Sequence, residues 1–129
     1  MDSVRVLVVE DDPSIQAILE AALEDAGFRI DAKSTAEAAI AVLEAAEPAY
    51  TAVMTDINLA PRGDTGWDVG RRARELNPAV AIVYMTGDAA ADWPSHGVPG
   101  SILLSKPFAP AQAVTAISQL LNTAAPPGA

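Results

Sequence analysis

Five short runs of apolar residues, separated by segments with helical spacing, constrain the fold of this chain more than any other feature. The runs occupy residues 4–9, 28–32, 50–55, 79–85 and 101–104. The first is a continuous β-branched run, which is typical of a strand buried on both faces. Apolar strands that alternate with helices predict a parallel sheet with helices on both sides. We therefore predict an α/β fold, doubly wound around a five-stranded parallel sheet.

Helix signals lie between these runs. Asp12 and Pro13 are suited to the N-cap and first position of a helix that Gly27 ends. Ser34 and Glu37 form a capping box for a second helix, to about residue 46. Further helices are predicted at residues 67–76 and 109–122.

Two segments are predicted to lack long helices. In residues 87–100, Pro94 and Pro99 together with Gly97 and Gly100 prevent a long helix. The last residues, "TAAPPGA", are expected to be a disordered tail at 123–129. The chain length of 129 residues suits one domain, which we place at residues 1–122.

Composition excludes several function classes. Lys and Arg total 8 against 17 Asp and Glu, a net charge of -9, which argues against a nucleic-acid partner. The absence of Cys excludes thiol catalysis and disulfides, and the single His96 excludes a multi-histidine metal cluster. The first apolar run is too short for a signal peptide or a membrane span. We therefore expect a cytoplasmic protein with no membrane partner.

Polar side chains follow four of the predicted strands. Glu10 and Asp11 follow the first, Asp56 the third, Thr86 the fourth and Lys106 the fifth. Because parallel strands bring their carboxyl ends to one edge, these groups should converge. Three neighbouring carboxylates either take up protons or hold a cation. Ligands that are all oxygen suit Mg²⁺, which keeps waters and shares oxygens with phosphate.

A phosphate at this edge would find suitable partners. The Lys106 ammonium and the Thr86 hydroxyl can bind its oxygens. An aspartate carboxylate can also act as the nucleophile and form an aspartyl phosphate. We therefore interpret Asp56 as a candidate phosphoryl acceptor.

Four segments, "VLVVEDDP", "VMTDINL", "VYMTG" and "LLSKPF", resemble in order the signature segments of the receiver domain of bacterial two-component response regulators. The resemblance covers residues 4–122 and implies the flavodoxin-like strand order 2-1-3-4-5. It implies phosphoryl transfer from a histidine kinase or a histidine phosphotransfer protein, followed by a change in affinity for a downstream protein. Because nothing follows the last helix, we expect a stand-alone receiver, which is not an enzyme beyond its own phosphorylation and dephosphorylation.

The resemblance also implies a role for each site residue. Asp56 is the phosphoacceptor, Thr86 the hydroxyl that follows the phosphoryl group, and Lys106 the partner of its oxygens. The Mg²⁺ site comprises Asp11 and Asp56 as ligands, Glu10 acting through water, and the backbone carbonyl of Asn58. The Lys106–Pro107 peptide bond is expected to be cis.

Three features depart from the family pattern. Leu103 stands where receivers commonly carry Tyr or Phe. The loop at residues 59–65 is longer than usual, and the segment 87–100 is interrupted by Pro and Gly. We therefore predict that switching moves these two segments instead of rotating an aromatic ring at position 103.

Other functions remain as alternatives. An aspartate-nucleophile phosphatase usually has a second Asp two residues after the nucleophile, where this chain has Asn58. A flavin-binding module needs a phosphate-cradling loop after the first strand, where "EDDP" would repel phosphate. A pseudo-receiver that serves only as an interaction module would not need the acidic cluster.

Overall fold

The computed structural model describes residues 4–45, 50–59, 65–87 and 92–124. Five parallel strands form one sheet in the order β2-β1-β3-β4-β5, which is the predicted order. The strands are β1 (Arg5–Val9), β2 (Arg29–Lys33), β3 (Ala52–Asp56), β4 (Ala81–Thr86) and β5 (Ile102–Ser105). The central strands β3 and β4 are buried throughout, whereas the edge strands β2 and β5 are partly exposed. The continuous apolar runs therefore mark strands that are covered on both faces.

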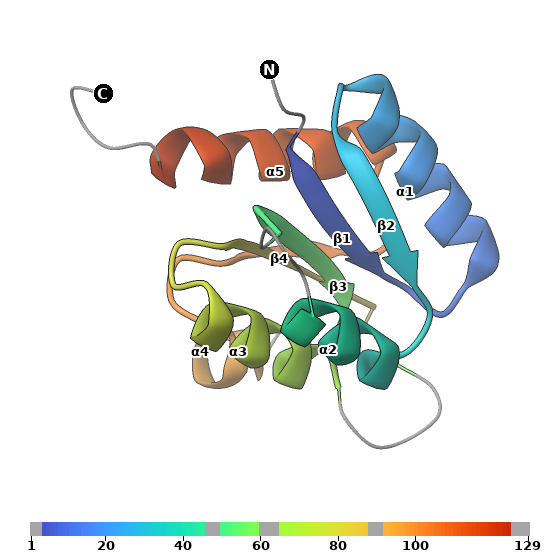
Figure 1. The fold of residues 1–129 in the computed structure, drawn as a ribbon. Coiled ribbons are helices and arrows are strands. Elements are labelled where there is room, and N and C mark those ends of the chain that lie inside the picture. Colours follow the sequence, from blue (N-terminus) through green and yellow to red (C-terminus); the bar gives the residue numbers. More distant parts are fainter. Residues whose placement is uncertain (1–3, 46–49, 60–64, 88–91, 125–129) are drawn as a thin grey trace.

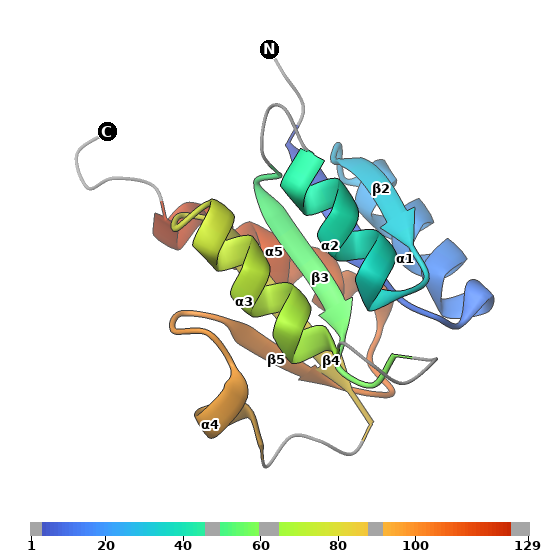
Figure 2. The ribbon, with the colours of Figure 1, turned by 60° about the horizontal axis from the view of Figure 1, so that its bottom comes forward.

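Helices cover both faces of the sheet (Figure 1). On one face lie α1 (Pro13–Asp25) and α5 (Pro110–Ala124), and on the other lie α2 (Ala36–Ala45) and α3 (Gly66–Leu76). A single helical turn, α4 (Trp93–His96), lies near the β5 edge (Figure 2). This short turn confirms, for residues 92–100, that the prolines and glycines prevent a long helix. Within the described ranges, no helix is long and apolar enough to cross a membrane.

The sheet divides the core in two. Val6 and Val8 pack with Leu19 and Ile117 on the face covered by α1 and α5. Leu7, between those two valines, belongs to the cluster on the opposite face. All five side chains are at most 1% exposed, and burying each stabilises the fold by about 1.5–3 kcal/mol.

The ends of two helices differ from the prediction. Thr35 caps α2 instead of Ser34, because the Thr35 hydroxyl accepts a hydrogen bond from the Ala38 amide at 3.1 Å. The last helix continues to Ala124, beyond the predicted end at residue 122, so the start of the expected tail is helical. The rest of that tail lies outside the described residues.

Candidate functional site: an acidic pocket at the strand ends

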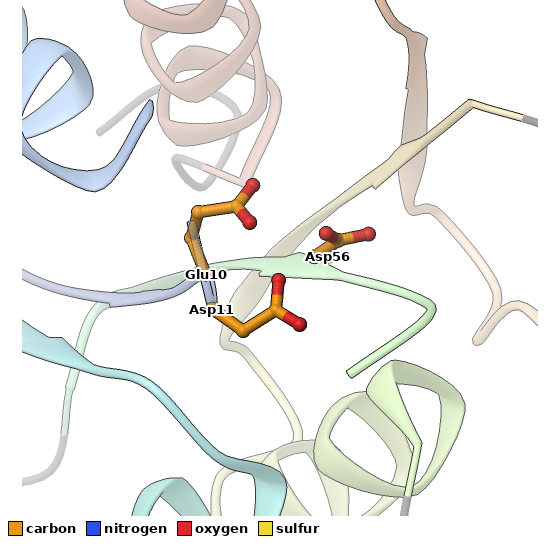
Figure 3. A group of neighbouring side chains, drawn as sticks. All are labelled: Glu10, Asp11 and Asp56. Carbon is orange, nitrogen blue, oxygen red and sulfur yellow. The ribbon is translucent and has the colours of Figure 1, made fainter. Parts of the chain in front are cut away.

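Three carboxylates lie together where β1 and β3 end (Figure 3). Glu10 and Asp11 follow β1, and Asp56 is the last residue of β3. The two strands pair in parallel, with Val9 opposite Thr55, so the residues that follow emerge side by side. One carboxylate oxygen from each of the three residues lies within 4.8 Å of the others. The predicted convergence of these acids is thus present.

Lys106 enters this cluster from the segment between β5 and α5. Its Nζ donates hydrogen bonds to Glu10 Oε1 at 2.8 Å and to Asp56 Oδ2 at 2.9 Å. Its backbone amide donates to the Thr86 carbonyl at 2.7 Å, which fixes the lysine at the end of β4. The Lys106–Pro107 peptide bond is cis, as predicted. One ammonium therefore bridges two carboxylates from different strands.

Burial governs the electrostatics of the pocket. Glu10 is 1% exposed and Asp56 is 5% exposed. Burial raises the pKa of Glu10 to about 7, although hydrogen bonds from Lys106 and from the Asp12 amide act to lower it. Burial alone would lower the pKa of Lys106, but its hydrogen bonds to Glu10 and Asp56 outweigh this effect and raise that pKa. The ammonium is thus held in its charged form.

The start of α1 orients Glu10. Asp12 is the N-cap, as predicted, and its side chain accepts hydrogen bonds from the amides of Ser14 and Ile15 at 2.9 and 3.3 Å. The Asp12 amide donates to Glu10 Oε2 at 3.0 Å. Both Glu10 oxygens therefore have donors, one from Lys106 and one from the turn into the helix.

Asn58, which follows β3, and Gly66, which begins α3, both lie next to Asp56. The Asn58 amide donates to Asp56 Oδ1 at 3.3 Å. A Cβ atom at Gly66 would lie 2.0 Å from the Asp56 carbonyl oxygen, so only glycine lets α3 begin this close to β3. Sequence reasoning missed Gly66, although a glycine at the first residue of a helix is unusual enough to have signalled it.

The remaining predicted residues lie at the same edge. Thr86 ends β4 and is 1% exposed, and the residue before it, Met85, pairs with Asp56. Asn58 directs its amide at Asp56, while the role of its carbonyl as a metal ligand stays a prediction. Most of the 59–65 loop, with residues 60–64, and residues 88–91 of the 87–100 segment lie outside the described residues.

Comparison with known proteins identifies the family. The response regulator receiver domain matches residues 6–118, and the chain belongs to this family. The receiver protein CpdR of Brucella abortus is 34% identical over 122 residues, which are 93% of this chain and 98% of CpdR. The solved structure of a response regulator receiver protein from Sinorhizobium medicae is 44% identical, with a TM-score of 0.91 over 96% of this chain and 98% of that one.

A more distant structure shows the fold alone. The receiver domain of the sensor histidine kinase PA1611 from Pseudomonas aeruginosa, which holds magnesium in its active-site cleft, is 24% identical to this chain. It aligns with a TM-score of 0.78 over 94% of this chain and 99% of its own. The family match over residues 6–118 makes this protein a receiver domain of the two-component type. Its pocket of Glu10, Asp11 and Asp56 is consistent with Mg²⁺ and a phosphoryl-accepting aspartate.

Proposed function

We propose that this protein accepts a phosphoryl group on Asp56 and thereby changes its affinity for a downstream protein. The observation that carries the proposal is the buried Asp56 carboxylate beside Lys106 and two further acids, in a receiver-family chain. A carboxylate oxygen of Asp56 attacks the phosphorus of the donor. The bond from phosphorus to the donor's leaving group breaks, and the leaving group departs with the electron pair.

Asp56 suits the nucleophile better than its neighbours do. Burial raises the pKa of Glu10 to about 7, which disfavours the carboxylate form that a nucleophile needs. Asp11 is more exposed than either of the other two acids. Asp56 is buried and lies next to an ammonium that can bind the arriving phosphoryl oxygens.

Mg²⁺ is the proposed cofactor, because the donor set fits it. Three carboxylates face each other with one ammonium among them, and all the ligands are oxygens. Asp11 and Asp56 would hold the ion directly, Glu10 through water, and Asn58 through its backbone carbonyl. When bound, Mg²⁺ would neutralise charge on the phosphoryl oxygens.

Lys106 and Thr86 stabilise the phosphorylated form in this proposal. The Lys106 ammonium donates to one phosphoryl oxygen, and the Thr86 hydroxyl moves toward another, each by a charge-assisted hydrogen bond. Thr86 stands at the end of the strand beside β3, within the same row of strand ends. Its movement would couple the pocket to the rest of β4.

The proposed donor is a histidine kinase or a histidine phosphotransfer protein. The downstream partner is a protein, and the net charge of -9 disfavours nucleic acid. We propose no enzymatic turnover beyond the protein's own phosphorylation and dephosphorylation. An aspartate-nucleophile phosphatase usually has a second Asp two residues after the nucleophile, and this chain has Asn58 there. A cytoplasmic location and a domain at residues 1–122 stay predictions.

Intact-protein mass spectrometry tests the proposal. After incubation with acetyl phosphate and Mg²⁺, the protein should gain the mass of one phosphoryl group. Asp56→Asn should gain none, and chelation of Mg²⁺ with EDTA should prevent the gain in the wild type. Asp12→Asn, which keeps a helix-capping side chain, is the matched control and should gain the group normally. Equal phosphorylation of Asp56→Asn and the wild type would show the assignment to be wrong.

A further inference from the structure

A buried aromatic residue, Tyr84, lies close to Thr86, whose hydroxyl is proposed to follow the phosphoryl group. Tyr84 precedes Thr86 by two residues on β4, so both side chains point to the same face of the sheet. Tyr84 is completely buried, and its ring packs on Trp67 with a centroid distance of 4.8 Å. Its neighbour across the ladder is Leu103, the position where the family commonly carries an aromatic residue. Of these two paired positions, the one on β4 and not the one on β5 therefore carries the aromatic ring.

The Tyr84 hydroxyl begins a continuous series of hydrogen bonds that reaches α4. It accepts from the Val98 amide at 3.2 Å. The Val98 carbonyl accepts from the Ser101 hydroxyl at 2.6 Å, and the Ser101 oxygen accepts from Trp93 Nε1 at 2.9 Å. Val98 and Ser101 are each 8% exposed, so solvent competes little with these bonds. We call the series Tyr84–Val98–Ser101–Trp93 the β4–α4 relay.

Two glycines make room for the relay. A Cβ atom at Gly70 of α3 would lie 2.2 Å from the Tyr84 hydroxyl oxygen, and one at Gly97 would lie 2.3 Å from the Trp93 ring. Both aromatic side chains thus fill space that any residue larger than glycine at position 70 or 97 would need. Tyr84 has no room to swing at that end, so a shift of β4 must carry its hydroxyl along with the strand.

We propose that the β4–α4 relay transmits the phosphorylation state of the pocket to α4, in place of an aromatic side chain at position 103. The inference rests on the proposed phosphoryl transfer to Asp56. A pull on the Thr86 hydroxyl displaces the end of β4, and Tyr84 moves with it. The bond to the Val98 amide, at 3.2 Å the longest of the three, then breaks, and the segment around α4 loosens.

Hydrogen exchange across residues 92–101 tests the relay, with beryllofluoride and Mg²⁺ as the phosphoryl mimic. In the wild type, exchange in this segment should accelerate roughly five- to tenfold on loading, as for the loss of one hydrogen bond. Tyr84→Phe keeps the ring and lacks the hydroxyl, so its exchange should be fast already and change little on loading. Ser101→Ala breaks the next link and should behave similarly. Tyr50→Phe loses the other tyrosine hydroxyl of the chain, outside the relay, and should respond like the wild type.

The outcomes separate the relay from the proposed function. Phosphorylation of each variant by acetyl phosphate is measured independently by intact mass. Suppose the wild type gains the phosphoryl group but residues 92–101 do not respond, or Tyr84→Phe and Ser101→Ala respond as the wild type does. The relay is then wrong while the role of Asp56 stands. A wild type that gains no phosphoryl group overturns both.

Discussion

At the scale of single residues, Lys106 holds the pocket together in the absence of a metal ion. Its ammonium lies between two carboxylates that are 1% and 8% exposed as side chains, and its own side chain is 23% exposed. Without it, two buried acids would face each other with the backbone amides of Asp12 and Asn58 as donors. The lysine therefore stabilises the fold as well as serving the proposed chemistry.

Replacing Lys106 by Ala should lower the free energy of unfolding by about 1–3 kcal/mol in EDTA, because buried carboxylates lose their charged donor. Urea denaturation measures this change. The matched control is Lys33→Ala, which removes the only other lysine of the chain. Lys33 contacts Glu10 through its backbone carbonyl, which the substitution keeps. If the two variants are equally stable, Lys106 does not have this structural role.

The sequence allowed the site residues to be predicted better than their partners. Asp56 and Lys106 could be placed because the ends of parallel strands meet at one edge, whatever the details of packing. The bond from Lys106 to Glu10 joins residues 96 apart in sequence, and no local pattern signals it. The same holds for Gly66 and Tyr84, whose importance depends on contacts made only in the folded chain.

At the scale of elements, a polar contact ties β1, β2 and the start of β3. The Tyr50 hydroxyl donates to Asp31 Oδ2 at 2.6 Å, and the Arg5 guanidinium lies 4.5 Å from the centre of the Tyr50 ring. The Tyr50 carbonyl accepts from the Asn77 side chain, outside the strand ladder. The strand β3 begins at Ala52 and not at the predicted residue 50, whose carbonyl is bonded to the Asn77 side chain.

From the hydrogen bond of Tyr50 to Asp31, we predict a loss of stability at alkaline pH. Burial and the bond to Asp31 raise the pKa of Tyr50 from 10.0 to about 12. Its contribution is therefore complete below the unfolded pKa and is lost as pH rises toward the folded one. Between about pH 9 and about pH 11, the wild type should lose about 1 kcal/mol more than Tyr50→Phe. Urea denaturation at both pH values measures this difference, and equal losses would contradict the predicted shift.

At the scale of the whole molecule, the fold gathers acids in a chain that already carries a net charge of -9. A bound divalent cation should therefore stabilise the folded state. At a Mg²⁺ concentration a hundredfold above its dissociation constant, the free energy of unfolding should rise by about 2.7 kcal/mol.

Charge-matched variants locate the ion that causes this stabilisation. Asp11→Asn should remove most of it, whereas Asp12→Asn, which drops the same charge one residue away, should retain it. Thermal unfolding with Mg²⁺ and with EDTA measures both. A similar Mg²⁺ response in the two variants would mean that the ion acts through general charge screening.

The whole architecture could be predicted because it depends on patterns that repeat along the chain. Five apolar runs fixed the number of strands, and the receiver resemblance supplied their order. Element ends were harder, as Thr35 shows, because neighbouring Ser and Thr are both good caps and only tertiary contacts choose between them. The proposed β4–α4 relay could not be predicted, since it depends on Tyr84, whose contacts come from separate segments of the chain.

Mapping the phosphoryl group tests the role of Asp56 as the phosphoacceptor. Borohydride reduces an aspartyl phosphate to homoserine, and peptide mass spectrometry then locates the changed residue. After treatment with acetyl phosphate and Mg²⁺, we predict homoserine at position 56 and an unmodified Asp11 and Asp12. Homoserine at either of those neighbours, or none at position 56 in protein that has gained the phosphoryl mass, would contradict it.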